Sequence, residues 1–93
     1  MSSNLVKEEE IQKILDESKI LVQTVFDKCT IVALQLPSGF VIVESSGAVD
    51  KETYSEKIGA EICYSKIVER LWEFEGYLLT DKISKGEKYE ENS

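Results

Sequence analysis

The stretch that decides the fold is Thr30–Ser45, which reads TIVALQLPSGFVIVES. Each half is a run of apolar and β-branched residues, which is typical of a strand. Pro37 and Gly39 lie between the halves, where proline presets a turn and glycine can adopt a positive φ. We therefore expect strands at 30–36 and 40–45, joined as a hairpin. Apolar residues alternate onto both faces, so both faces of the sheet are candidates for cover by a helix or by a second subunit.

A third strand is expected upstream, at Lys19–Phe26 (KILVQTVF), with only Asp27-Lys28 before the next strand. Three consecutive strands with short connections predict an antiparallel meander. Before them, residues 6–18 carry apolar residues at helical spacing, with acids in the first turns, where the helix dipole favours negative charge. We expect an N-terminal helix there, with Asn4 as its candidate cap.

Downstream, residues 44–51 read ESSGAVDK, which indicates a loop of small and hydroxyl-bearing residues. Thr53 and Glu56 fit a capping box at the start of a long helix. Gly59 is expected to permit close packing of that helix, and Gly76 is expected to end or bend it. The apolar stripe expected on the helix comprises Tyr54, Ile58, Ile62, Cys63, Ile67, Leu71, Phe74 and Leu78.

These elements predict one α+β domain at residues 5–83, with the long C-terminal helix packed on the sheet. The 93 residues suffice for one small domain. Residues 1–4 and the acidic tail at 84–93 lack an apolar period, so we expect both ends to be flexible. A domain this small buries little surface alone, which favours a homo-oligomer, a dimer or higher.

Composition excludes several classes of protein. The net charge is −7, whereas a duplex-DNA binder needs a basic surface. The chain has no histidine, which removes Ser-His and Cys-His nucleophile pairs and most zinc sites. No apolar run is long enough to span a membrane, and the N-terminus lacks the apolar core of a signal peptide. Cys29 and Cys63 have no metal-ligand spacing, so we expect free thiols in a reducing cytoplasm, although a disulfide between them stays open.

The central part of the chain resembles a family of small tailed-phage proteins, typified by the gene-49 product of coliphage N-four and the gene-66 product of a Shigella phage. The family pattern has a Thr-Val strand, a Gly-Phe turn, a small-residue loop ending in Asp, an Ile-Gly helix start and a Trp-x-x-Glu-Gly-Tyr-Leu-Leu ending. The corresponding segments here are Thr30–Val32, Ser38–Phe40, Glu44–Asp50, Tyr54–Gly59 and Leu71–Leu79. Ser38, Ala48 and Lys51 stand where the family usually has Asn, Cys and Pro, and the last change should loosen the loop.

The same pattern is similar to that of the type-one Thoeris anti-defence proteins. These phage-encoded sponges sequester the cyclised ADP-ribose signal made by bacterial TIR-domain sensors. The resemblance implies a non-enzymatic protein without a cofactor, acting in the cytoplasm of the infected host. Its ligand would be a cyclic ADP-ribose isomer or a cyclic oligonucleotide, and homo-oligomeric assembly is associated with the family.

A sponge for such a ligand needs cations, hydroxyl donors and aromatic surfaces. Lys66 and Arg70 lie four residues apart on one face of the long helix, and Arg70 is the only arginine. Its planar fork suits a pyrophosphate. The alternative for Arg70 is a salt bridge with Glu69, with Glu73 or with an acid from elsewhere.

Further ligand-binding candidates come from the loop and from the aromatic residues. Ser45 and Ser46 offer hydroxyls before a helix N-terminus, and Asp50 offers an acceptor for ribose hydroxyls or an adenine amine. Turn and capping chemistry explains these three residues equally well. Phe40 could stack on a base or pack in the core, and Trp72 could line a pocket or fill an interface or the core.

The sequence therefore predicts a phage anti-defence protein that binds a cyclic nucleotide signal without degrading it. One alternative is an acidic phage protein that inhibits a host enzyme by direct protein–protein binding. Another is a structural or accessory phage protein with no ligand. Convergence of Lys66 and Arg70 on the loop at 45–50 would favour the first hypothesis.

Overall fold

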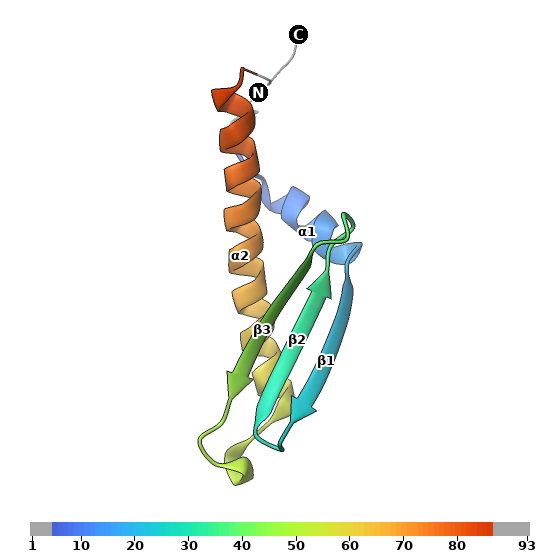
Figure 1. Cartoon of the computed structure of the whole chain (residues 1–93), viewed down its shortest axis with the longest axis vertical. Coiled ribbons are helices and arrows are strands. Elements are labelled where there is room, and N and C mark those ends of the chain that lie inside the picture. The colour runs from blue at the N-terminus through green and yellow to red at the C-terminus, as the bar shows by residue number, and fades with distance from the viewer. Residues whose placement is uncertain (1–4, 87–93) are drawn as a thin grey trace.

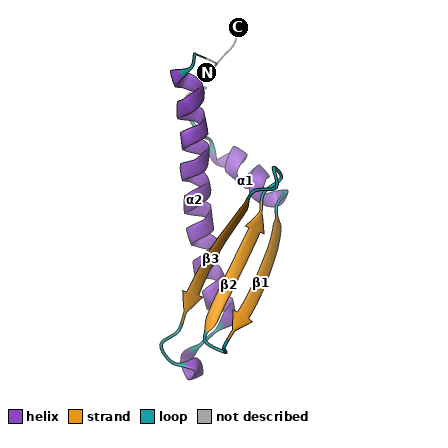
Figure 2. Cartoon of the chain, viewed as in Figure 1, coloured by secondary structure: helices purple, strands orange, loops and turns teal. Residues whose placement is uncertain are grey.

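The computed structural model describes residues 5–86, which form an α+β domain with the expected order of elements (Figure 1). A helix is followed by a three-stranded antiparallel meander, a 3-10 turn and a long helix (Figure 2). The predicted fold class is thus confirmed. The elements are α1 (Glu8–Asp16), β1 (Lys19–Val25), β2 (Cys29–Gln35), β3 (Val41–Gly47), η1 (Lys51–Thr53) and α2 (Glu56–Ser84).

The sheet has the order β1-β2-β3, with β2 in the centre. The turn between β1 and β2 is built on Phe26 and Asp27, which both have positive φ angles, 53° and 56°. The turn is closed by the Lys28 N–H, which donates to the Val25 carbonyl at 3.2 Å. Left-handed backbone at both central residues matches the twist of a hairpin. Gly39 has φ +99° in the second hairpin, as its sequence position predicts.

One face of the sheet is covered by α2, which packs on β2 and β3 (Figure 1). The centre of this layer is fully buried and consists of Val32 and Ile42 from the sheet with Cys63 and Ile67 from the helix. Leu15 of α1 packs against the same core, so α1 lies on the α2 side of the sheet. No element within residues 5–86 covers the opposite face of the sheet, on which Leu21, Val41 and Val43 are exposed.

The N-terminal end of α2 makes its closest approach to β2 at Gly59. A Cβ atom on Gly59 would lie 2.8 Å from the Thr30 Cβ and closer still to the Thr30 hydroxyl oxygen. Thr30 is fully buried, and its hydroxyl lies 2.6 Å from that of Tyr54. The Tyr54 hydroxyl also lies 2.6 Å from Thr24 Oγ1, which donates to Glu56 Oε2 at 2.5 Å. Gly59 therefore permits the close packing that was expected of it, and a chain of hydroxyls satisfies the polar groups at the contact.

The predicted capping box at Thr53 and Glu56 is wrong. Ser55 is the N-cap of α2, and its Oγ accepts from the Ile58 N–H at 3.3 Å. The Thr53 hydroxyl donates instead to the Asp50 carbonyl, while Glu56 is held by the sheet residue Thr24. A tertiary partner for the glutamate has thus replaced the local one, and the cap lies two residues later in the chain.

Strand limits differ from the prediction by one residue at several ends, and Phe26, predicted in a strand, lies in the first hairpin turn. Three larger differences remain. α2 continues through Gly76 to Ser84, because one glycine costs only about 1 kcal/mol in a helix and good helix formers follow it. α1 is shorter than the predicted residues 6–18 and has Lys7 as its N-cap. β3 continues past the predicted limit at Ser45 to Gly47, because Ser46 and Gly47 pair with Thr30 and Cys29 of β2. Asn4 and both predicted flexible ends, apart from Ser84 to Gly86, lie outside the described residues.

The buried stripe of α2 is narrower than predicted. Gly59, Cys63, Ile67 and Leu71 recur every four residues and are buried, with Phe74 half-buried beyond them. Ile58, Ile62 and Leu78 belong to the predicted stripe but are exposed. Since 29 residues span about 43 Å at 1.5 Å per residue, α2 is about twice as long as the seven-residue strands and extends past them (Figure 2). Within residues 5–86, no helix has the length and apolarity that a membrane span requires.

The Gly59 contact predicts the effect of two matched substitutions. Gly59→Ala should lower the free energy of unfolding by about 2 kcal/mol or more, because the new methyl group meets the Thr30 side chain. Gly76→Ala should raise it by about 0.5–1 kcal/mol, because nothing lies within 4 Å of its added Cβ. Urea denaturation measures both. Equal effects of the two substitutions would contradict the proposed close contact.

The buried thiol predicts how stability depends on pH. Both cysteines are free, and burial raises the pKa of Cys63, with smaller contributions from its charged neighbours. The thiol therefore stays protonated in the folded state at pH values where the unfolded chain loses the proton. We expect the free energy of unfolding to fall as the pH rises above about 8.5, the ordinary pKa of a thiol. Urea denaturation at pH 7.5 and 9.5 should show a smaller fall for Cys63→Ala than for Cys29→Ser, and equal falls would contradict the assignment.

Candidate functional site

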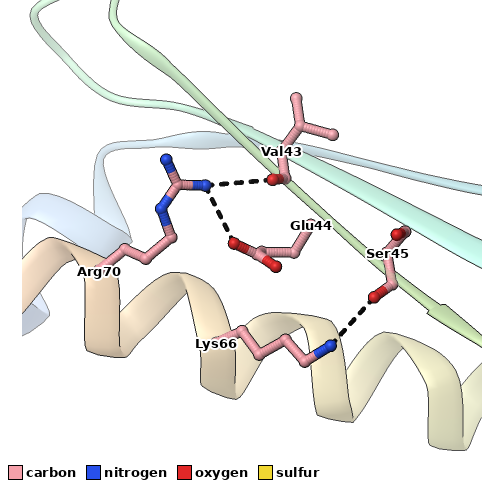
Figure 3. A network of polar contacts seen from close by, with 5 residues as sticks. All are labelled: Val43, Glu44, Ser45, Lys66 and Arg70. Atoms are coloured by element: carbon pink, nitrogen blue, oxygen red, sulfur yellow. Dashed lines mark hydrogen bonds and ion pairs between the residues drawn. The ribbon is translucent and has the colours of Figure 1, made fainter.

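Two basic side chains of α2 reach the outer edge of β3 (Figure 3). Lys66 Nζ donates to the Ser45 carbonyl at 3.1 Å, and Arg70 Nη1 donates to the Val43 carbonyl at 3.2 Å. β3 pairs with β2 on its other side only. The two cations thus satisfy carbonyl groups that a neighbouring strand would otherwise satisfy, and they tie the helix to this edge.

Arg70 also makes an ion pair and an aromatic contact. Its Nη1 lies 3.0 Å from Glu44 Oε2, with 39% of the arginine side chain and 22% of the glutamate side chain exposed. The guanidinium carbon lies 5.6 Å from the centre of the Phe74 ring. Phe40 meets Phe74 edge to face, with ring centres 5.6 Å apart and planes at 89°. We call Phe40, Glu44, Lys66, Arg70 and Phe74 the β3-edge cluster.

The cluster leaves part of the guanidinium free for a ligand. Among residues 5–86, no hydrogen bond uses Nε or Nη2 of Arg70, and Figure 3 shows the second terminal nitrogen directed away from Val43 and Glu44. Phe40, which contacts Phe74 as Arg70 does, is 56% exposed. A guanidinium with uncommitted donors suits a phosphate or pyrophosphate, and an exposed aromatic ring suits a base. The arrangement can therefore hold a nucleotide-like anion at the surface.

Three of the seven predicted site residues come together here, namely Phe40, Lys66 and Arg70. Ser45 contributes its carbonyl, while its side chain lies on the opposite face of the sheet from α2. The two bases therefore meet β3 at residues 43–45, and only Lys66 reaches the predicted segment at 45–50.

The other predicted site residues lie outside the cluster. Ser46 lines a small cavity of about 100 Å³ with Thr53, Tyr54 and Gly59, at the N-terminal end of α2. Asp50 caps η1, where its Oδ1 accepts from the Glu52 N–H at 3.0 Å, so it makes the capping contact foreseen as an alternative. Trp72 is 38% exposed on α2 and takes no part in the contacts of the cluster.

Two members of the cluster were not among the predicted site residues. Phe74 belongs to the predicted apolar stripe, and its position four residues after Arg70 is a signal that the two share a helix face. Glu44 lies where the predicted strand at 40–45 overlaps the predicted loop at 44–51. Its alternation with Ile42 places both on one face of that strand, which is the helix-facing side. The salt bridge of Arg70 is made with this acid from the sheet, and not with Glu69 or Glu73.

Comparison with known proteins identifies the family. The sequence model of the N4 Gp49/phage Sf6 gene 66 family of phage proteins matches residues 2–83. The chain belongs to this phage protein family. No curated protein matches the chain, and no solved structure does. The family match covers α1, the sheet and nearly all of α2, so the β3-edge cluster lies within the family domain.

Two of the segments that resemble the family pattern make contacts that explain their residues. The Tyr54–Gly59 segment supplies the hydroxyl, the cap and the glycine that seat α2 on β2. The Leu71–Leu79 segment includes Phe74 and continues into the part of α2 that extends past the strands. Within residues 5–86, no three His, Cys, Asp or Glu side chains are grouped so that they could hold a metal ion.

The Arg70–Glu44 pair predicts a small and salt-dependent coupling. Both side chains are partly exposed, so a double-mutant cycle of Arg70→Ala and Glu44→Ala should give about 0.2–1 kcal/mol at low salt. The coupling should decline at 1 M NaCl, where screening acts over about 3 Å. Urea denaturation of the four proteins measures it. A coupling above 2 kcal/mol that salt leaves unchanged would show that the pair is structural and is not available to a ligand.

Proposed function

We propose that this phage protein binds and sequesters a cyclic nucleotide immune signal, a cyclised ADP-ribose or a cyclic oligonucleotide, in the cytoplasm of the infected bacterium. Family membership supports a phage protein, and the resemblance to the type-one Thoeris anti-defence proteins supports this class of ligand. The structural observation that most supports the proposal is the guanidinium of Arg70. It lies against Phe74, which also contacts the exposed Phe40, and two of its nitrogens make no hydrogen bond within residues 5–86.

Local charge makes anion binding feasible on an acidic protein. The net charge of −7 repels an anionic ligand at long range, so capture depends on cations close to the site. Lys66 and Arg70 provide two such cations on neighbouring turns of α2. Glu44 is the carboxylate of the cluster, and its charge is compensated by Arg70. An incoming phosphate would therefore meet the unused side of the guanidinium rather than the carboxylate.

The chemistry of the cluster favours capture over turnover. General acid–base catalysis needs a titratable group within hydrogen-bond reach of the reacting atoms. The cluster offers a guanidinium, an ammonium, one ion-paired carboxylate and two phenyl rings, and it contains no nucleophile next to a base. We therefore expect the ligand to be recovered unchanged. Sequestration also requires tight binding and protein in excess of the signal.

The direct test is titration of the full chain with cyclised ADP-ribose isomers and with cyclic dinucleotides. Isothermal titration calorimetry should show saturable binding of at least one of them. Arg70→Ala should weaken that binding at least tenfold, about 1.4 kcal/mol, because hydrogen bonds to a charged ligand are lost. Lys82→Ala is the matched control, since it removes a cation of α2 that lies in the groove between α1 and α2. It should leave the affinity unchanged.

The same samples distinguish the proposal from its alternatives. Mass spectrometry after heat denaturation should return the intact ligand, and a cleaved product would show an enzyme instead. Absence of binding at high micromolar concentration of every ligand would contradict the proposal. A stable complex with a host enzyme in that case would identify the inhibitor function that the acidic composition also permits.

A further inference from the structure

β1 forms an open edge of the sheet (Figure 1). It also carries exposed apolar side chains. Ile20 is 54% exposed, Leu21 is 65% exposed and Val22 is 39% exposed. Ile20 and Val22 lie on the α2 side and Leu21 on the opposite side, because successive residues of a strand point to opposite faces. The edge is therefore apolar on both faces, which is the feature that natural sheets usually avoid at an edge.

The hydrogen-bond pattern shows which backbone groups of β1 are unpaired. The Leu36 N–H donates to the Phe40 carbonyl at 2.8 Å, so the even-numbered residues of β2 bond to β3. The odd-numbered residues of β2 must then bond to β1, and their partners in β1 are also odd-numbered. The N–H and C=O groups of Ile20, Val22 and Thr24 consequently point out of the sheet, and no hydrogen bond to them occurs within residues 5–86.

The opposite edge of the sheet is protected. The same pattern directs the carbonyls of Val43 and Ser45 out of β3, and these are the two that Arg70 and Lys66 engage. Positive side chains at an edge prevent another strand from adding there. One edge is thus blocked by the helix, whereas the other presents a row of unpaired backbone groups.

We propose that β1 pairs antiparallel with β1 of a second copy of this chain, about a two-fold axis at Leu21, and forms a continuous six-stranded sheet. In this register Leu21 lies opposite its own equivalent, and Ile20 lies opposite Val22 of the partner subunit. The unpaired backbone groups of Ile20 and Val22 then bond to each other across the axis. Register follows the hydrophobic pattern of a strand, and this register matches the three exposed apolar residues with one another.

Charge favours a second copy as the occupant of this edge. The chain carries a net charge of −7, so most pairings of two copies bring like charges together. Residues 20–26 are uncharged, and Lys19 falls opposite the neutral Gln23 of the partner subunit. An edge strand can also pair antiparallel with its own copy, because the unpaired N–H groups of one strand then meet the unpaired C=O groups of the other.

The α2 side of this edge has room for the added strand. α2 packs on β2 and β3 and leaves a shallow groove of about 480 Å³ beside β1. The groove is lined by Ile20 with Ala60, Glu61 and Tyr64 of α2. A partner strand on β1 would cover Ile20 and Val22 from the open side, which no described element does in the single chain.

The first test is the mass of the full chain in solution without nucleotide. Sedimentation equilibrium at about 100 µM should give about 21 kDa, which is twice the 10.5 kDa of one chain. Leu21→Lys should give a monomer, because it places two like charges opposite each other at the axis. Val43→Lys is the matched control, an apolar residue of similar exposure (51%) on the same sheet face at the protected edge. It should remain a dimer, and circular dichroism verifies that both variants fold.

A second test fixes the register and does not depend on the effect of an added charge. In a Cys29→Ser background, Leu21→Cys should form a disulfide-linked dimer on mild oxidation, because directly opposed residues lie about 4.5–5.5 Å apart between Cα atoms. Gln23→Cys should not, since its copies would be about 13 Å apart along the strand. A monomeric wild-type chain, a Leu21→Lys dimer or cross-linking at Val22→Cys in place of Leu21→Cys would each overturn the proposal. A Val43→Lys monomer would indicate packing through the sheet face and would also overturn it.

Discussion

The contact between Gly59 and Thr30 is the constraint on which the rest of the structure depends. Without a side chain at Gly59, α2 comes close enough to β2 for Thr30 and Tyr54 to form a buried hydroxyl pair. Every fourth residue after Gly59, up to Leu71, is then buried, and Cys63 and Ile67 pack on the sheet core. The close contact at Gly59 therefore fixes the rotation of α2 about its own axis. Lys66 and Arg70 lie on the side that faces β3, and their positions at the sheet edge follow from the Gly59 contact, about two and three turns earlier.

The two edges of the sheet differ for the same reason. Because α2 runs over β2 and β3, its long basic side chains reach the carbonyls of β3, and β1 receives no cover of this kind. The proposed ligand site and the proposed dimer contact consequently lie at opposite edges of the sheet, at β3 and at β1. Nucleotide binding at the β3-edge cluster and pairing through β1 can therefore occur together. Neither proposal requires the other.

Much of the fold could be predicted because the sequence pattern is local. Period-two apolar runs separated by turn residues specify the meander, and a helical apolar spacing specifies α2. One error arose where a tertiary partner decides, since Glu56 is held by Thr24 of β1 rather than by a cap. Another arose at Gly76, which stays helical because one glycine costs a helix little. The site was partly predicted, since helical spacing pairs Lys66 with Arg70. No local sequence pattern indicates that both bases engage carbonyls of β3. That contact depends on which residues of β3 direct their carbonyls out of the sheet and on the rotation of α2.

The most direct measurement of this account is the nuclear Overhauser effect between Gly59 and Thr30 in the isotopically labelled full chain. The account predicts cross-peaks between the Gly59 α-protons and the side chain of Thr30, together with a Thr30 amide that is strongly protected from hydrogen exchange. Absence of those cross-peaks, with Gly59 exposed to solvent, would show that α2 is not seated on β2 at this point. The positions derived for Lys66 and Arg70 would then be contradicted as well.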